Sequence, residues 1–401
     1  MRTDFEAEFL ATPAGKRANE ILRACVHCGF CNATCPTYQL TGDELDGPRG
    51  RIYLIRELLQ SGDNRERASA HLDRCLTCRA CETTCPSGVA YGELAEIARH
   101  HLGPDRAGWV GTVRRGLRWV VPRPGWLRPL VRLGRALRWL LPRPLRDHLP
   151  SQVGSPLRLT AGRPAQTRGH VLLLNGCVQQ VHTAATNKHL LALLQRHGFS
   201  AETVAAEACC GSLDLHLGAT ERALQLARQN VDAWYPRLAQ VDAIVSTASG
   251  CGVTAQDYGR LLQDDPQYAA RAAQVAACVV DIAPWLAQLG LELQAARTEQ
   301  RVAWQAPCSL QHGQAVHGVV EQLLTNAGYH LTRVPDSHLC CGSAGTYSLL
   351  QPQLSGALKR QKLAALGSDS PQLVATANVG CQHHLATDCA VPVLHWIELL
   401  K

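Results

Sequence analysis

Eight cysteines near the beginning of the chain form two copies of one short pattern. The pattern is C-x2-C-x2-C-x3-C-P, and it fills residues 25–36 and again residues 75–86. Thiolates at this spacing let one tight loop hold three iron corners of a cubane, with backbone N–H groups turned toward the sulfur atoms. Zinc binding or structural thiols would not require the same four-cysteine pattern twice, closed each time by Pro. The two runs therefore predict two [4Fe–4S] clusters.

The fourth cysteine of each run is expected to serve the other cluster. It follows its loop after a helical turn and points away from it, as in two-cluster proteins with this spacing. Cluster 1 is then assigned to Cys25, Cys28, Cys31 and Cys85, and cluster 2 to Cys75, Cys78, Cys81 and Cys35.

A second set of cysteines recurs at a nearly fixed interval in the C-terminal part of the chain. Cys177 and Cys308 are 131 residues apart, and the two C-C-G sequences that follow them are also 131 residues apart. Such an offset predicts a tandem duplication, with two α/β halves related by a pseudo-twofold axis. The repeated cysteines are Cys177, Cys209, Cys210 and Cys251 in the first half, and Cys308, Cys340, Cys341 and Cys381 in the second.

Three uses of the repeated cysteines are compatible with the sequence. The first is a further Fe–S centre of unusual form, because adjacent cysteines do not span the corners of a cubane comfortably. The second is a dithiol/disulfide redox site, and the third is a purely structural role inherited from an ancestor. Cys278 and Cys389 fall outside the repeat and are predicted to be small core residues. Nearby histidines are predicted to be hydrogen-bonded polar residues and not ligands, namely His216, His312, His338, His383 and His384.

The cysteines require two kinds of scaffold. Helical periodicity predicts an α-helical region around the first eight, and short apolar runs that end just before a repeated cysteine predict the strands of parallel sheets. The predicted helices include residues 5–24, 52–59, 66–72 and 93–102, and the predicted strands are 170–174, 243–247, 302–305 and 373–376. The predicted fold is an α-helical two-cluster ferredoxin-like domain (1–103), a connecting segment (104–168), and an α/β duplicated cysteine-rich (CCG) domain with repeats at 169–295 and 296–401.

The composition favours redox or metal chemistry inside the cell. The chain has 401 residues, of which 18 are Cys and 46% are hydrophobic. Its first residues include acids and no apolar stretch, so no export signal is expected and a disulfide scaffold is disfavoured. No uninterrupted apolar run approaches the roughly 18 residues of a spanning helix. We expect a cytoplasmic protein, or one bound peripherally at the inner face of the cell membrane.

The net charge of +7 originates in one segment. Residues 106–146 contain 11 Arg and no acid, which leaves −4 for the rest of the chain and disfavours a nucleic-acid binder. The same segment holds four of the eight Trp and five prolines that are expected to cut it into short helices, including Pro129. Three interpretations stay open: a membrane-surface helix, a docking site for a partner subunit, or a linker with solvated Arg side chains.

The sequence lacks the motifs of nucleotide cofactors and of metalloprotease chemistry. It contains no G-x-G-x-x-G, no P-loop and no H-E-x-x-H. We predict no flavin or nicotinamide site and no catalytic residue in this chain. It is expected to carry electrons while another subunit performs the two-electron organic chemistry.

The order of the motifs resembles the iron–sulfur subunits of flavin-linked 2-hydroxyacid and glycerol-3-phosphate dehydrogenases and the heterodisulfide reductase family. A more specific resemblance is to the iron–sulfur subunits of bacterial glycolate oxidase (glycolate dehydrogenase), and it spans nearly the whole chain apart from residues 100–168. It rests on CVHCGFCNATCPTY (25–38), GDELDGPRGRIYLI (42–55), HLDRCLTCRACETTCPS (71–87), TASGCG (247–252), VPDSHLCCGSAGTY (334–347) and HWIEL (395–399).

This resemblance implies a complex of three subunits. A flavin subunit with FAD oxidises glycolate to glyoxylate, a second flavin-type subunit assists, and the iron–sulfur subunit passes electrons toward a quinone or another acceptor. The alternatives are a subunit that serves lactate or glycerol 3-phosphate, and a thiol enzyme similar to heterodisulfide reductase. That last family ends its cysteine segment with C-x-x-C, whereas Cys251 and Cys381 have no second Cys at that spacing.

Overall fold

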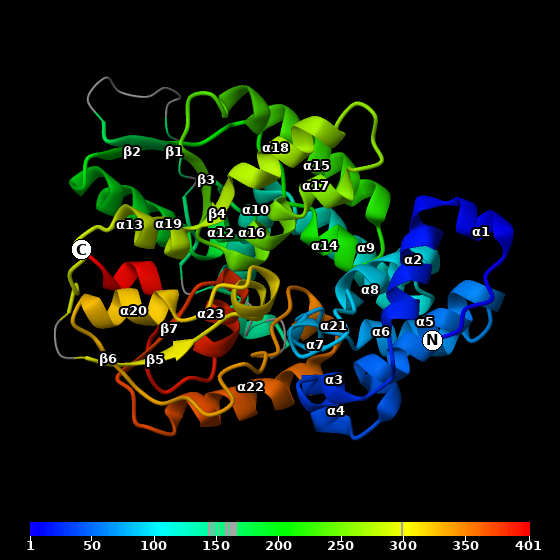
Figure 1. Cartoon of the computed structure of the whole chain (residues 1–401). Coiled ribbons are helices and arrows are strands. Elements are labelled where there is room, and N and C mark those ends of the chain that lie inside the picture. The colour runs from blue at the N-terminus through cyan, green and yellow to red at the C-terminus, as the bar shows by residue number, and fades with distance from the viewer. Residues whose placement is uncertain are drawn as a thin grey trace.

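A computed structural model describes residues 1–142, 146, 149, 150, 152–155, 157, 159, 167–297 and 300–401. Figure 1 shows a helical N-terminal domain (blue) at one end, packed against two α/β halves, the first in green and the second in yellow to red. Within these described ranges, no helix is both long and apolar enough to cross a membrane.

The N-terminal domain is entirely helical around its two cysteine loops. Its core is formed by three of the longer helices. Their fully buried side chains include Leu22, Ile55, Leu58 and Leu94. Thr12 caps the second helix by accepting a hydrogen bond from the Gly15 N–H at 2.9 Å. The elements are α1 (Ala7–Ala11), α2 (Pro13–Ala24), α3 (Phe30–Ala33), α4 (Pro36–Thr41), η1 (Glu44–Asp46), α5 (Pro48–Ser61), α6 (Arg65–Asp73), α7 (Ala80–Thr83) and α8 (Tyr91–Leu102).

The connecting segment forms two helices and a short turn, α9 (Gly108–Val120), α10 (Pro124–Ala136) and η2 (Arg138–Leu140). Pro129 lies inside α10, so the prediction that it would end a helix was wrong. An internal proline costs about 3 kcal/mol or more. The burial of Leu127 and Val131 against Val181 of the first half offsets this cost.

Three arginines of this segment bind neighbouring domains. Arg106 and Arg114 pair with Asp73 of the helical domain, at 3.0 and 2.9 Å, and Arg118 pairs with Asp214 of the first half at 2.8 Å. These side chains are therefore not solvated, and the segment joins the helical domain to the first half.

Each α/β half contains one four-stranded parallel sheet, and the strand order is the same in both. The orders are β2-β1-β3-β4 and β6-β5-β7-β8. Four of these strands are only two to four residues long and were not predicted. The strands are β1 (Gly169–Leu173), β2 (Phe199–Glu202), β3 (Ala243–Ser246), β4 (Val279–Asp281), β5 (Arg301–Gln305), β6 (His330–Leu331), β7 (Leu373–Thr376) and β8 (Val393–His395).

Helices flank both sheets. In the first half they are α12 (Gln179–His182), α13 (Ala184–Arg196), α14 (Ser212–His216), α15 (Thr220–Trp234), η3 (Tyr235–Arg237), α16 (Ser249–Gln256), α17 (Tyr258–Leu261), α18 (Ala269–Cys278) and α19 (Ile282–Leu289). In the second half they are η4 (Ser309–Gly313), α20 (Val319–Asn326), α21 (Tyr347–Leu350), α22 (Pro352–Gly367), α23 (Val379–Ala386) and η5 (Trp396–Leu399).

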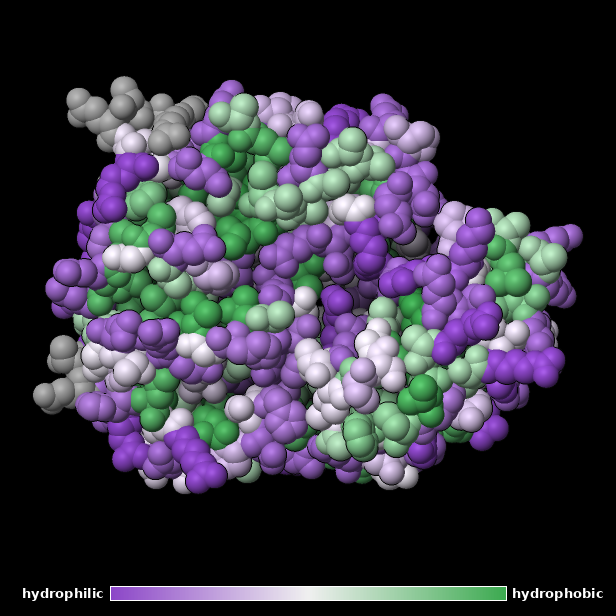
Figure 2. Space-filling view, viewed as in Figure 1, coloured by the Kyte–Doolittle hydropathy of each residue, from purple (hydrophilic) through white to green (hydrophobic). Residues whose placement is uncertain are grey.

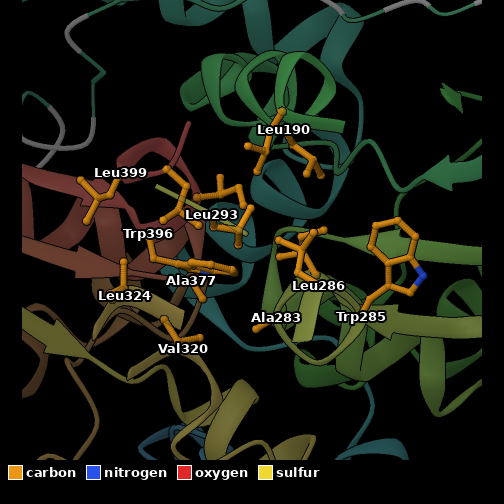
Figure 3. Close-up of a cluster of buried hydrophobic side chains, with 14 of the residues drawn as sticks. Leu190, Ala283, Trp285, Leu286, Leu293, Val320, Leu324, Ala377, Trp396 and Leu399 are labelled. Carbon is orange, nitrogen blue, oxygen red and sulfur yellow. The ribbon is translucent and has the colours of Figure 1, made fainter. Parts of the chain in front are cut away.

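The two halves share one hydrophobic core. Leu190 and Leu286 of the first half pack in the same buried cluster as Leu324 and Trp396 of the second (Figure 3). Polar contacts cross the same interface, among them the hydrogen bond between the Ser249 and Ser309 hydroxyls at 2.8 Å. The duplicated domain is therefore a single packed unit.

Candidate metal centres

The two cysteine runs fold into loops of the same shape. Each loop has two residues with a left-handed backbone, 50 residues apart in the two copies: His27 and Gly29 (φ 57° and 86°), and Thr77 and Arg79 (φ 54° and 62°). Left-handed residues turn the chain sharply and direct successive N–H groups toward one side, which suits an anionic group. The one-turn helices α3 and α7 follow and carry the third cysteine of each run.

The loops meet just before their fourth cysteines. The Thr84 hydroxyl donates to the Thr34 hydroxyl at 3.1 Å, and both hydroxyls donate to the Ala80 carbonyl, at 3.1 and 3.3 Å. Thr34 and Thr84 directly precede Cys35 and Cys85. This contact brings the fourth cysteine of each run beside the other loop.

The eight cysteines line two neighbouring cavities in the crossed grouping that the sequence predicts. One cavity, of about 430 Å³ including its open part, is lined by Cys25, Cys28, Cys31 and Cys85. The other, of about 360 Å³, is lined by Cys35, Cys75, Cys78 and Cys81. Cys81 borders both, so the cavities are adjacent. Four sulfur donors around each cavity fit the chemistry of an Fe–S cubane, and the assignment of ligands stays a prediction.

A buried arginine on α5 flanks the second cavity. Arg51 is 1% exposed, donates to the His71 carbonyl at 2.9 Å and to the Thr37 hydroxyl at 3.1 Å, and lies 4.0 Å from Cys35 Sγ. The carboxylate of Asp46 is 3.8 Å away and is shared with other cationic partners. Arg51 therefore places a positive charge directly beside one of the predicted ligands of cluster 2.

A second buried arginine, Arg99 on α8, approaches the same cavity. It donates to the Thr77 hydroxyl at 2.6 Å and to the carbonyls of Leu72 and Cys75 at 3.0 Å. Within the described part of the chain, these partners are all neutral oxygen atoms. Burial would raise the pKa of the Cys75 thiol, but the positive charges of Arg51 and Arg99 lower it below its ordinary value.

The first cavity lies at the surface of the helical domain. Cys28 is exposed, and burial together with the neighbouring thiols raises the pKa of Cys31 to about 11. The nearest guanidinium, that of Arg49, is half-exposed and paired with the Glu44 carboxylate at 2.6 Å. The cluster 1 cavity is thus more exposed than the cluster 2 cavity, and the positive charge of the arginine beside it is balanced by a carboxylate.

In each half the repeated cysteines form one row of thiol contacts. The rows are Cys177–Cys209–Cys210–Cys251 and Cys308–Cys340–Cys341–Cys381. The Sγ atoms of Cys177 and Cys209 are 3.3 Å apart, as are those of Cys341 and Cys381. The hydrogen bond that the Cys177 thiol donates to Cys209, together with burial, raises the pKa of Cys177 well above its ordinary value. A thiol of this kind stays protonated at neutral pH and is a weak nucleophile unless a metal binds it.

The row of the second half lies against the cluster 2 loop. Leu76 and Cys78 of the loop pack in one buried group with Cys308, Cys340 and Leu358 of the second half. The loop is therefore covered by the second half, and Cys78 packs directly against the second row.

Two further features distinguish this contact. The His312 ring bonds the Thr83 hydroxyl of the loop at 3.0 Å through Nδ1 and the His338 carbonyl at 3.1 Å through Nε2. Lys362 is almost fully buried and donates to the Ser337 carbonyl at 2.8 Å. Burial lowers the pKa of Lys362, whereas negative charge on the four thiols of the second row raises it, so the amino group lies near that row.

The row of the first half has neutral neighbours from its own half. Cys209 and Cys210 pack with Leu226, the Asn230 amide donates to the Cys209 carbonyl at 3.2 Å, and the Tyr258 hydroxyl donates to the Cys210 carbonyl at 3.0 Å. Among the described residues, none from the helical domain belongs to this buried group.

The remaining predicted residues have minor roles. Cys278 and Cys389 are half-buried at the margins of hydrophobic clusters, so they contribute to packing without being central. His384 bonds the Ser355 hydroxyl at 3.3 Å, as expected of a polar core residue. The buried cations were not singled out from the sequence. The sequence could have indicated that Lys362 is buried, because it lies four residues from both Leu358 and Leu366 on the buried face of α22.

Comparison with known proteins agrees with this geometry. The "4Fe-4S dicluster domain" family matches residues 21–89, and the "Cysteine-rich domain" family matches residues 171–256 and 302–386. The chain is 46% identical to the glycolate oxidase iron-sulfur subunit of Escherichia coli (strain K12), over 100% of this chain and 98% of that protein. It is 32% identical to the probable glycolate oxidase iron-sulfur subunit of Bacillus subtilis (strain 168), over 95% of this chain and 92% of that protein.

More distant relatives share the architecture. One of the subunits of the fumarate reductase (CoM/CoB) from Methanothermobacter marburgensis is 24% identical over 94% of this chain and 72% of that protein. A crystal structure of a hypothetical protein from Helicobacter pylori has a similar fold, with a TM-score of 0.57 at 10% identity over 96% of this chain and 71% of that one.

The fold and the cysteine sets define an electron-transfer protein with a two-cluster iron–sulfur domain followed by two cysteine-rich domains. The chain belongs to the family of glycolate oxidase iron–sulfur subunits. It carries [4Fe–4S] clusters and is the non-catalytic iron–sulfur subunit of an oxidoreductase complex.

Proposed function

We propose that this chain accepts electrons from a flavin subunit that oxidises glycolate to glyoxylate, and delivers them toward a quinone. The oxidation releases two electrons and two protons, the partner's flavin takes up the electron pair, and reduction of a quinone to a quinol balances the sequence. Bound [4Fe–4S] clusters supply one-electron chemistry. The observation that carries the proposal is the pair of adjacent cavities, each lined by cysteines from both loops.

We assign cluster 1 to the set of Cys25, Cys28, Cys31 and Cys85, and cluster 2 to the set of Cys75, Cys78, Cys81 and Cys35. The test is iron and acid-labile sulfide per chain, together with electron paramagnetic resonance of the anaerobic protein. The four-iron count of each motif predicts about eight iron atoms from these two sets. The chain alone should oxidise no glycolate, and the complex with its flavin subunit should. Glycolate turnover by the isolated chain would overturn the proposal.

We further propose that the two halves are related by a pseudo-twofold axis. The proposed domains are residues 1–103, the connecting segment 104–168, and the two repeats at 169–295 and 296–401. The common strand order and the equal rows of thiols support the axis. The repeated cysteines are a third site, for metal or thiol redox chemistry, and the second row is the better candidate because it meets the cluster 2 loop and a buried ammonium group. An iron count clearly above eight would assign them to metal binding.

We propose that α9, α10 and η2 form the face that meets the inner side of the membrane, where a quinone is available. Here nine large hydrophobic side chains are exposed, including Trp109, Trp119, Trp126 and Trp139. The segment also contains many Arg and no acid between residues 106 and 146, which favours anionic headgroups. Liposome co-sedimentation with and without anionic lipid tests this face, and equal binding of Trp126→Glu and parent would contradict it.

The substrate of the complex has a second candidate. The related chains from Bacillus velezensis and Bacillus subtilis that are named lactate utilization protein A match 58% of this chain at 25% and 23% identity. A substrate panel of glycolate, lactate and glycerol 3-phosphate on the purified complex distinguishes these substrates. Preference for lactate or glycerol 3-phosphate would replace glycolate while leaving the electron-transfer role intact.

A further inference from the structure

Large hydrophobic side chains are exposed in only two places in the described part of the chain. Nine belong to residues 109–140, which form the face proposed for the membrane. The other three are Val26, Phe30 and Tyr53, with exposed fractions of 68%, 60% and 43%. They flank the cluster 1 loop. Gathered apolar side chains on a protein surface mark an interaction site.

Exposed Cys28 lies between Val26 and Phe30 in the sequence, and all four cysteines assigned to cluster 1 line the same cavity as Val26. Figure 2 shows hydrophobic and neutral residues gathered over the α3–α4 end of the molecule. The cluster 2 loop is covered instead by Leu358 and the second row of thiols. A partner that approaches the helical domain from outside therefore reaches the cluster 1 cysteines first.

Contacts within the chain position the side chains of this face. The His27 ring lies tilted against the Tyr53 ring, with the ring centres 4.6 Å apart, and the Arg56 guanidinium lies 5.3 Å from the centre of the Tyr53 ring. Gly29 has a φ of +86°, and a Cβ there would lie 3.0 Å from the Arg49 guanidinium. Preorganised aromatic and apolar residues lose little entropy on binding.

The charge beside this face is mixed, because the paired Arg49 and Glu44 and the Arg56 guanidinium over Tyr53 all lie near it. Arg49 is neutralised by Glu44, so the surroundings differ from the acid-free arginine segment of residues 106–146. A small apolar centre with aromatic residues and a polar rim is typical of protein interfaces, where a few such residues supply most of the affinity.

We propose that the surface formed by Val26, Cys28, Phe30 and Tyr53, the Cys28 face, is the docking site of the electron-donating flavin subunit, and that electrons enter the chain here. The inference rests on the proposed function, because it takes a reduced flavoprotein as the donor. The membrane face lies on α9–η2, so donor and acceptor meet the chain at different surfaces.

The test uses the full chain and its purified flavin subunit under anaerobic conditions. Phe30→Glu adds a carboxylate to the centre of the Cys28 face, and Phe30 contributes little to the core because it is mostly exposed. The dissociation constant for the flavin subunit should rise at least about tenfold, as expected for a central interface residue. Ala270→Glu, on the exposed surface of α18, adds the same charge away from this face and should leave the constant unchanged.

A second measurement separates docking from folding. Iron content and the dithionite-reduced resonance spectrum of Phe30→Glu should equal those of the parent. Reduction of the chain by glycolate-reduced flavin subunit should slow at least about tenfold at limiting concentrations. An unchanged dissociation constant and an unchanged rate would overturn the docking site, and loss of binding by Trp109→Glu instead would move it to α9. If the parental chain itself is not reduced by that flavin subunit, the proposed function fails, independently of the face.

Discussion

The two cysteine-rich halves have the same strand order and the same row of four thiols, but they have different neighbours. In the second half the row touches Leu76 and Cys78 of the cluster 2 loop and faces buried Lys362. The row in the first half packs with neutral groups, among them Asn230 and Tyr258. Duplication of the fold therefore did not duplicate its surroundings: among the described residues, the second row packs with the cluster 2 loop and the first row does not.

Replacement of one thiol in each row gives the largest expected difference. Cys340→Ser should lower glycolate-dependent quinone reduction by the complex at least about tenfold, a loss in the range for disturbed metal sites. The matched change Cys209→Ser should retain most of the activity, because Cys209 contacts no residue of the cluster loops among those described. Equal losses in the two variants would show that the halves are functionally equivalent.

The contact between the second half and the cluster 2 loop can be weakened without touching a cysteine. Leu358→Ala removes a buried side chain beside Leu76 and should cost about 2–5 kcal/mol of unfolding free energy. Leu226→Ala in the first half should cost a similar amount. The resonance spectrum of cluster 2 should change in the first variant only, and a change in the second would contradict the asymmetry.

On the helical side, the two loops differ in the charge beside them. Arg99 is buried with neutral partners, whereas Arg49 is paired with Glu44. Loss of a buried positive charge disfavours the more negative, reduced state of a nearby cluster. Arg99→Gln should therefore lower the midpoint potential of cluster 2 in a redox titration followed by electron paramagnetic resonance. Arg49→Gln should shift cluster 1 less, and a larger shift with Arg49→Gln would reverse the comparison.

The smallest expected effect is on the pH dependence of stability, and it concerns Asp281 and His395. Each ends the last strand of its sheet and caps the helix that follows, α19 or η5. Burial raises the pKa of Asp281 to about 7 and lowers the pKa of His395 to about 4. Between about pH 4 and pH 7 the folded Asp281 keeps a proton that the unfolded chain releases, so this residue makes stability fall as pH rises. His395 acts in the opposite direction between about pH 4 and pH 6.5, since the unfolded chain then holds the proton.

Asp281→Asn keeps the oxygen that accepts the Ala283 N–H but cannot ionise. Its melting temperature relative to the parent should therefore increase as pH rises from about 5 to about 7, measured anaerobically, and level off above that. A difference that stays constant with pH would show that Asp281 does not titrate in this range.

The sequence predicts the parts of the fold that depend on local pattern. The two cysteine loops, the long helices of the first hundred residues and the central strands of both sheets follow from spacing and periodicity. The edge strands β6 and β8 have two and three residues, too few for an alternating pattern to be recognised. Pro129 fits inside α10 because packing against the first half outweighs its local cost, and such packing cannot be read from propensity.

The sequence predicts which cysteines line the two cavities, but it does not predict the residues that surround them. The eight cysteines belong to two motifs that can be read from the sequence. The buried arginines depend on partners from other segments: Arg51 binds the Thr37 hydroxyl, and Arg99 binds the carbonyl groups of Leu72 and Cys75. Which half meets the cluster 2 loop depends on Leu76 and on residues of α21 and α22 almost 300 positions away.

Contacts from three directions hold the helical domain in place. Arg114 of the connecting segment binds both Asp73 and the Leu217 carbonyl, at 2.9 and 3.0 Å, and Arg260 of the first half binds Glu96 at 2.9 Å. The contact of Thr83 with the second half completes the set. Such bracing disfavours a swinging motion of the helical domain, so we expect the spacing between redox groups inside the chain to stay constant. Internal transfer should then proceed at the same rate in buffer and in viscous glycerol solution.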